Sequence, residues 1–267
     1  MRRINKIIKS EGTGNISPFI DGVLAQELAP FVLFDAVHAT TDKTWGFDWH
    51  PHSGVATLTY IYGATLNHQD SGGNNGAIYE GGFQWMQAGN GIWHKEYYEP
   101  KEGRVNALQL WVQLSPGVED QPNRYFDRSH SEIPKFGDNV DVLVGSLGEV
   151  EADSPIPVSM TYLNVALSAG DKVSLPLADD QRKGIVYVVS GSVNVGGSML
   201  NEMELGILSN DGGELNLQSS TESRLIVAVV KDEGHPLVAE RGQVHTNRES
   251  LVNAAKNIQS MARSIRG

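Results

Sequence analysis

The sequence predicts an all-β protein, and three observations support that fold class. In ALQLWVQL (107–114) the apolar side chains from Leu108 to Leu114 share one face, and the residues between them point the other way, which is the period of a strand. Helix formers are diluted by Val, Ser, Thr and 29 glycines. Short stretches of this kind recur with turn signals between them. The combination is typical of a β-sandwich or a small barrel.

Two further stretches predict strands that a glycine interrupts, and together they indicate two similar domains. They are VATLTYIYGATL (55–66) and GIVYVVSGSVNV (184–195), and Tyr187 in the second follows Tyr60 in the first by 127 residues, about half the chain. DSGGNNGAI (70–78) predicts a hairpin connection with Asn75-Gly76 at its turn. The polar segment 115–139 is the predicted linker. We therefore predict one β domain over residues 1–130 and a second over 131–267.

One helix is predicted at the end of the chain. Thr246 and Glu249 have the spacing of a capping box. Apolar residues then recur on one helical face, at Leu251, Ala254, Ala255, Ile258, Met261, Ala262 and Ile265. We expect this terminal helix to dock on a barrel.

Composition and charge exclude several classes of function. The net charge is −11, and no dense basic patch follows the first nine residues, so direct nucleic-acid binding is not expected. The chain has no cysteine, which removes disulfides and thiolate ligands. The basic stretch MRRINKIIKSEG leads into no apolar core and so is not a secretory signal, and the apolar run LIVAVV (225–230) is too short to cross a bilayer. We expect a cytoplasmic protein that is not anchored in a membrane.

Two pairs of side chains at the same spacing are candidate metal ligands. They are His50 with His52, and His94 with Glu96, each pair next to strand-like sequence. On a strand, residues i and i+2 project from one face about 6–7 Å apart, whereas on a helix they point in different directions. If the two strands are neighbours, all four side chains converge. Three imidazoles and one carboxylate suit Fe(II), Mn, Ni, Cu or Zn and leave open positions for catalysis.

The other histidines give no comparable pattern. A single H-x-H is a weak signal, because surface histidines are common. His38, His68 and His130 occur singly, and no histidine lies between residues 131 and 234, so we expect no metal site in the second domain. We expect polar contacts at a hairpin end for His68, and structural or solvated positions in loops for His235 and His245. Phosphate-binding and nucleophile-elbow motifs are absent from the sequence.

Several motifs together resemble the pirin family of the cupin superfamily. They run in order as PFVLFD (30–35), HPHSG (50–54), TLTY (57–60), HQDSGGNNG (68–76), QWMQAGNGIWHKE (84–96) and LQLWVQL (108–114). The second half is similar more loosely, through GIVYVVSGSVNVGG and PLVAERGQVHTNRESL. The resemblance implies a bicupin, two antiparallel β-barrels of the jelly-roll type in tandem with a C-terminal helix, and metal in the first barrel alone.

Carried onto this sequence, the ligands that the resemblance implies are His50, His52, His94 and Glu96, with Fe(II) as the foremost metal. Three departures from the family pattern adjoin this region: Asp48 and Trp49, and Ser53 where the family has arginine in HPHRG. Near the C-terminus GQVHTN stands where the family reads PFVMNT. These departures bear on substrate identity more than on metal binding.

Two functions follow from the resemblance. The first is a dioxygenase similar to quercetinases, which open a flavonol with O2 and release carbon monoxide. Glu96 would then be ligand and base, and Trp49, Gln84, Trp85 and Met86 would line or support the pocket. The alternative is an iron-dependent regulatory protein that binds a protein partner without turnover. We expect a small aromatic substrate and O2 as partners in the first case, and a monomeric chain.

Overall fold

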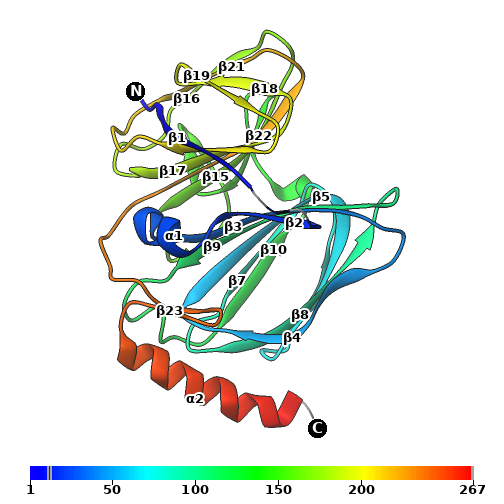
Figure 1. Ribbon diagram of the computed structural model, residues 1–267, viewed down its shortest axis with the longest axis vertical. Coiled ribbons are helices and arrows are strands. Elements are labelled where there is room, and N and C mark those ends of the chain that lie inside the picture. The colour runs from blue at the N-terminus through cyan, green and yellow to red at the C-terminus, as the bar shows by residue number, and fades with distance from the viewer. Residues whose placement is uncertain (11, 13, 266–267) are drawn as a thin grey trace. The chain divides into compact units, whose positions relative to one another are not determined.

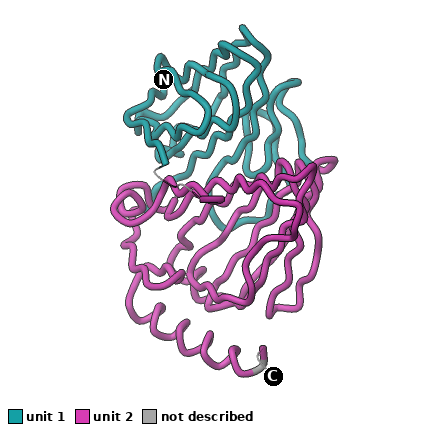
Figure 2. The backbone as a smooth tube through the Cα atoms, turned by 45° about the vertical axis from the view of Figure 1, so that its right-hand side comes forward, with its two compact units in different colours: residues 1–11, 133–233 teal, residues 12–132, 234–267 magenta. Residues whose placement is uncertain are grey.

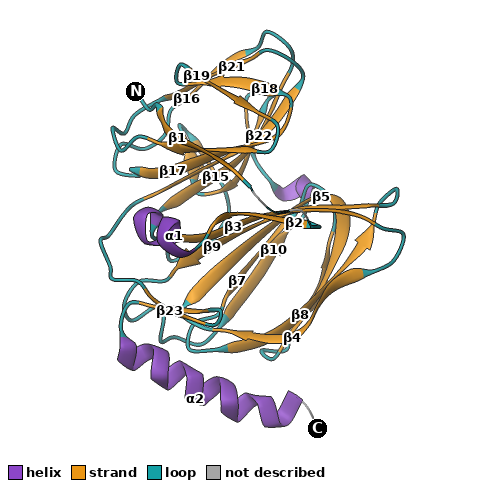
Figure 3. Ribbon diagram, viewed as in Figure 1, coloured by secondary structure: helices purple, strands orange, loops and turns teal. Residues whose placement is uncertain are grey.

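The computed structural model describes residues 1–10, 12 and 14–265, and strands predominate, as Figure 3 shows. Contacts divide the chain into two compact units (Figure 2). Unit 1 holds residues 1–11 and 133–233, and unit 2 holds residues 12–132 and 234–267. The predicted fold class, two antiparallel β domains with a C-terminal helix, is confirmed.

The two units differ from the predicted domains at both ends of the chain. The first strand, β1 (Ile4–Lys9), pairs with β20 (Glu204–Leu208) and so belongs to unit 1. The terminal helix, α2 (Arg248–Ile265), belongs to unit 2, where Nε1 of Trp93 donates to the carbonyl of Ile258 at 2.9 Å. Both differences from the predicted domains come from contacts between residues that are far apart in the sequence.

Unit 1 is built from two main antiparallel sheets around an aliphatic core. The seven-stranded sheet has the order β1-β20-β17-β22-β15-β12-β11, and the four-stranded sheet has the order β16-β21-β18-β19. Valine and leucine side chains from both sheets form one buried cluster. The remaining strands are β11 (Lys135–Phe136), β12 (Val140–Val144), β13 (Ser146–Leu147), β14 (Val150–Glu151), β15 (Met160–Leu167), β16 (Lys172–Leu175), β17 (Lys183–Ser190), β18 (Ser192–Val195), β19 (Ser198–Asn201), β21 (Leu215–Ser219) and β22 (Ser223–Val230).

Unit 2 is built around a nine-stranded antiparallel sheet that includes the paired strands β4 and β8 (Figure 1). It also holds the short helix α1 (Gly22–Leu28), which was not among the predicted elements, and the 3-10 turn at His130–Glu132. Its strands are β2 (Ile16–Ile20), β3 (Phe31–Thr40), β4 (Trp45–His52), β5 (Val55–Asp70), β6 (Asn75–Ile78), β7 (Phe83–Gln87), β8 (Ile92–Pro100), β9 (Arg104–Gln113), β10 (Arg124–Arg128), β23 (Val238–Glu240) and β24 (Gln243–His245).

Three local predictions need correction. The hairpin between β5 and β6 is present, but Asn75 and Gly76 lie in β6, and the positive φ of +94° is at Gly73. The predicted linker 115–139 contains β10, which pairs with β7. Helix α2 is capped by Asn247, whose side-chain oxygen accepts from the amide of Ser250 at 2.9 Å, and not by Thr246.

The predicted apolar face of α2 is confirmed where it is most buried. Leu251, Ala254 and Ile258 have exposed fractions of 3%, 2% and 6%. Among the described residues, no helix is long and apolar enough to span a membrane.

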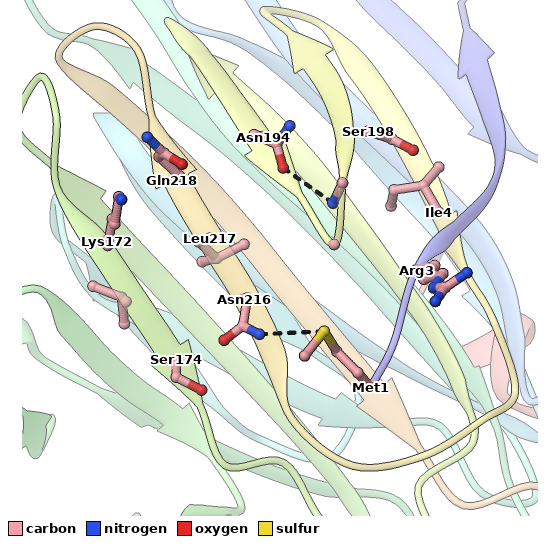
Figure 4. Close-up of a pocket in the computed structure, with 13 residues that line it drawn as sticks. Met1, Arg3, Ile4, Lys172, Ser174, Asn194, Ser198, Asn216, Leu217 and Gln218 are labelled. Carbon is pink, nitrogen blue, oxygen red and sulfur yellow. Dashed lines mark hydrogen bonds between the residues drawn. The ribbon is translucent and has the colours of Figure 1, made fainter.

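Unit 1 also has a hollow of about 860 Å³ (Figure 4). Polar side chains such as Lys172, Asn194 and Asn216 line it together with aliphatic ones such as Ile4. All of its lining residues belong to unit 1. The hollow is therefore separate from the histidine pairs, which belong to unit 2.

Candidate metal centre

The pairing of β4 with β8 brings the two predicted ligand pairs together. In this register His50 lies opposite His94, and Phe47 lies opposite Glu96, with a bulge between Phe47 and His50. Strand β8 also pairs with β5, which places His68 opposite Glu96. The two side chains of each i, i+2 pair project from one face of their strand, and the pairing of the strands brings the two pairs together.

Three imidazoles converge at this point. One nitrogen from each of His50, His52 and His94 lies within 4.8 Å of the other two. The ring centroids of His50 and His94 are 4.2 Å apart, and those of His52 and His94 are 5.0 Å apart. His52 and His94 are buried, and His50 is half-buried. This cluster is compact enough for one ion.

Backbone carbonyls fix the orientation of two of the rings. Nδ1 of His50 lies 2.7 Å from the carbonyl oxygen of Asp48, and Nδ1 of His52 lies 2.9 Å from that of Gly242. Because a carbonyl oxygen only accepts, each Nδ1 carries the hydrogen and each Nε2 keeps a free lone pair. Histidines that bind metals are commonly held in this way.

His94 shows that the cluster fits a metal ion. Both of its ring nitrogens are buried and have no hydrogen-bond partner among the described residues. Such unpaired groups are costly in a protein interior unless something satisfies them. A metal ion bound by His50, His52 and His94 would supply a partner for one of these two nitrogens.

The protonation of the imidazoles also suits a metal. Burial, followed by the neighbouring His50, lowers the pKa of His52 to about 4. Burial, followed by the charges of His52 and His50, lowers the pKa of His94 well below its ordinary value. Both rings are therefore neutral at neutral pH, and their lone pairs are available.

Glu96 lies beside the imidazole cluster and is 1% exposed. Nδ1 of His94 is 3.7 Å from its Oε1, and Nε2 of Gln84 donates to the same oxygen. Glu96, His94 and His68 form a second group whose ligand atoms lie within 4.8 Å of one another. His94 is common to both groups, so the structure brings all four predicted ligands into one region.

His68 is more than a residue at a hairpin end. It is buried on β5, its ring stacks on that of Tyr125 at 4.7 Å, and its Nε2 lies 3.3 Å from Oδ2 of Asp70. Burial opposes protonation of His68, but the contact of Nε2 with Asp70 and the nearby carboxylate of Glu96 overcome it and raise the pKa of His68 to about 9. An imidazolium between two carboxylates is a poor ligand, and it is well placed to hold Glu96.

Of the four residues expected to line or support the pocket, some lie at the site and others lie in the core. Gln84 contacts Glu96 directly, and Nζ of Lys95 lies 5.2 Å above the ring of the half-buried Trp49. Trp85 and Met86 are core residues, 1% and 0% exposed. Gln84 is therefore the member of the set that the structure ties to the site.

A third group of metal-capable side chains was not predicted. Glu119, Asp120 and His245 offer ligand atoms within 4.8 Å of one another. His245 was expected in a loop, but it lies on β24 and is 0% exposed. The change from the family pattern at GQVHTN was the one signal of this region in the sequence. Within the described part of the chain, all three metal-capable groups belong to unit 2.

Fold and site together define a two-domain antiparallel β protein with a His- and Glu-lined candidate metal centre in one domain. Two family models match the chain: Pirin over residues 15–112 and the Pirin C-terminal cupin domain over residues 162–257. The chain belongs to the pirin family.

Similarity to individual proteins supports this assignment. A Pseudomonas aeruginosa protein named "Putative quercetin 2,3-dioxygenase PA3240" is 31% identical over 265 residues, which cover 93% of this chain and 92% of that protein. The fold is similar to that of quercetin 2,3-dioxygenase from Acinetobacter baumannii, with a TM-score of 0.87 and 23% identity over 97% of each chain. It is also similar to the Escherichia coli pirin YhhW, solved in complex with nickel(II), with a TM-score of 0.66, 21% identity and coverage of 86% of this chain and 99% of that one.

Proposed function

We propose that this chain is a metal-dependent dioxygenase of the quercetin 2,3-dioxygenase type that cleaves a flavonol-like substrate with O2. The observation that carries the proposal is the convergence of three imidazole rings beside the buried carboxylate of Glu96. A relative with 31% identity over most of its length carries this activity in its name. In the reaction the flavonol is oxidised, both oxygen atoms of O2 enter the ring-opened product, and one ring carbon leaves as carbon monoxide.

In this proposal His50, His52, His94 and Glu96 hold one divalent metal ion, with Fe(II) as the first choice. Three imidazoles and a carboxylate form a mixed nitrogen and oxygen set, which Mn, Ni, Cu and Zn also accept. When bound, the ion supplies Lewis acidity for the substrate oxygen and an open position for the chemistry.

Glu96 is the proposed base. One of its carboxylate oxygens takes the proton from the flavonol hydroxyl, which makes the substrate electron-rich enough to react with O2. Gln84 donates to Oε1 and His68 lies 3.7 Å from the same oxygen, so both side chains orient the carboxylate. Because Glu96 is 1% exposed, water competes little for the proton.

The second barrel has no metal in this proposal, and the chain acts as a monomer. The interior of unit 1 is filled by Val and Leu side chains from both of its sheets. Among the described residues, the three groups of side chains that could hold a metal ion all belong to unit 2. The role of unit 1 is then structural, and the chemistry belongs to unit 2, which holds residues 12–132 and 234–267.

Oxygen uptake tests the proposal. Apoprotein is reconstituted separately with Fe(II), Mn(II), Ni(II), Cu(II) and Zn(II), given quercetin, and followed by an oxygen electrode and by loss of the flavonol absorbance. We expect uptake that depends on metal and that Glu96→Gln abolishes. Glu99→Gln is the matched control, because Glu99 lies on the same strand but is exposed. Absence of uptake with every metal at full occupancy, or full activity in Glu96→Gln, would overturn the proposal.

A further inference from the structure

The side chain of one candidate ligand, His52, is contacted by a segment that lies almost 200 residues away in the sequence. The carbonyl of Gly242 accepts from Nδ1 of His52 at 2.9 Å. Next to it, the amide of Val244 donates to the carbonyl of Ser53 at 2.9 Å, and Ser53 and Gln243 form an isolated parallel bridge. The segment that runs from Gly242 to Asn247 therefore lies along the end of the strand that carries His52. We call these six residues the clasp.

A buried row of three side chains joins the clasp to the barrel. Oγ of Ser53 lies 2.9 Å from Nε2 of His245, and Nδ1 of His245 lies 3.3 Å from Oε2 of Glu119. All three residues are 0% exposed. The order Ser–His–Glu is that of a hydrolytic triad, but a hydroxyl with no exposed surface has no access to a substrate. The row is therefore suited to hold structure in place.

Glu119 is an anchor for the clasp and not a metal ligand. Its carboxylate accepts from the amide of Thr246 at 2.7 Å, from the hydroxyl of Thr246 at 2.6 Å and from Nδ2 of Asn247 at 3.2 Å. With His245 this makes four contacts, and a carboxylate has about four acceptor positions. Both carboxylate oxygens are therefore engaged by residues of the clasp.

Two glycines permit the close approach of the clasp. A Cβ at Gly54, where φ is +68°, would lie 1.9 Å from the carbonyl oxygen of Val244. A Cβ at Gly242, where φ is +78°, would lie 3.2 Å from Nδ1 of His52. Any side chain at either position would push the clasp away from the strand that carries His52.

We propose that Ser53, His245 and Glu119 are positioning residues that hold the carbonyl of Gly242 against Nδ1 of His52 and so set the orientation of that imidazole at the metal centre. This inference rests on the proposed function and deepens it. Because the hydrogen bond to Gly242 keeps Nε2 of His52 free for the ion, loosening the clasp lets the ring rotate. Partners of this kind are typically worth about 10–100-fold in metal affinity.

The test measures metal binding directly, with Co(II) as the probe because its visible bands report ligand geometry. Purified full-length protein is titrated with Co(II), and the dissociation constant and band positions are recorded for wild type, His245→Leu and His245→Gln. We expect His245→Leu to bind at least about tenfold more weakly, with shifted bands. His245→Gln, whose amide reaches the position of Nε2 beside Ser53, should recover part of the loss.

Asn257→Ala is the matched control for a purely structural effect. Asn257 anchors α2 by donating to the carbonyl of Asn90 at 3.0 Å, outside the clasp. We expect this variant to melt earlier than wild type but to keep the wild-type affinity and bands. An equal loss of affinity in Asn257→Ala and His245→Leu would overturn the positioning role.

The remaining outcomes separate this inference from the proposed function. If His245→Leu folds and binds Co(II) as wild type does, the inference fails and the metal centre stands. If it does not fold, Ser53→Ala, which removes one hydroxyl alone, decides by the same two readouts. If wild type itself does not bind Co(II), or His94→Ala binds it equally well, the proposed centre fails and the inference fails with it.

Discussion

The carboxyl group of Asp35 provides a prediction of how stability depends on pH. Asp35 lies on β3 between Pro18 of β2 and Gln109 of β9. Burial, followed by the charge of Asp21, raises its pKa from 3.8 to about 6. A raised pKa means that the folded protein holds this proton more tightly than the unfolded chain. The contribution of Asp35 to stability is therefore full below about pH 4 and is lost as the pH rises through about 6.

The magnitude follows from the size of the shift. A change from 3.8 to about 6 corresponds to about 3 kcal/mol, at about 1.4 kcal/mol for each pKa unit. Asp35 is half-buried, so solvent screens part of this penalty. We expect Asp35→Asn, which removes the charge, to raise the free energy of unfolding by about 1–2 kcal/mol at pH 7.5.

Urea unfolding of wild type and Asp35→Asn at several pH values between 4 and 7.5 checks this prediction. The gain should be largest at pH 7.5 and should shrink toward zero at pH 4. Asp21→Asn removes the smaller cause alone and should give a smaller gain. Equal stability of Asp35→Asn and wild type at pH 7.5, or a lower stability of the variant there, would refute the reasoning.

Three further variants test other parts of the structure. Changing Arg2 to Met should lower the free energy of unfolding by about 3 kcal/mol, because Arg2 is 0% exposed and donates to three backbone carbonyls. Urea unfolding with a wild-type midpoint would contradict this. Leu251→Ala should cost about 2–4 kcal/mol in the same assay, because it leaves a cavity under α2, and a loss below 1 kcal/mol would argue against docking of that face. Gly242→Ala should weaken Co(II) binding about tenfold by displacing the carbonyl that faces His52, and an unchanged affinity would oppose the role of the clasp.

Local patterns in the sequence were sufficient to predict the parts of the fold that depend on neighbouring residues. The alternation around Leu110 predicts strand β9, and the apolar face from Leu251 predicts α2. The shared i, i+2 spacing selects four side chains that do lie in one region, because β4 and β8 are paired. Each of these predictions uses a period that the backbone itself imposes.

Contacts between distant residues could not be predicted in this way. His68 occurs singly in the sequence and belongs to no ligand-like pair, yet the register of β5 with β8 places it beside Glu96. The pairing of β1 with β20 and the contact of Gly242 with His52 depend on the folded topology, which no local period encodes. Ser53 and the GQVHTN segment departed from the family pattern in separate parts of the chain, and the structure shows that they meet.

The most direct test of the metal centre is the iron content of the protein. Wild type, His94→Ala and His130→Ala are loaded with Fe(II) without oxygen, desalted and analysed for metal per chain, with the exposed His130 as control. We predict about one iron per chain in wild type and in His130→Ala and almost none in His94→Ala, because His94 is common to both ligand groups. Equal iron in all three proteins, or none in wild type, would contradict the assignment of this cluster as a metal centre.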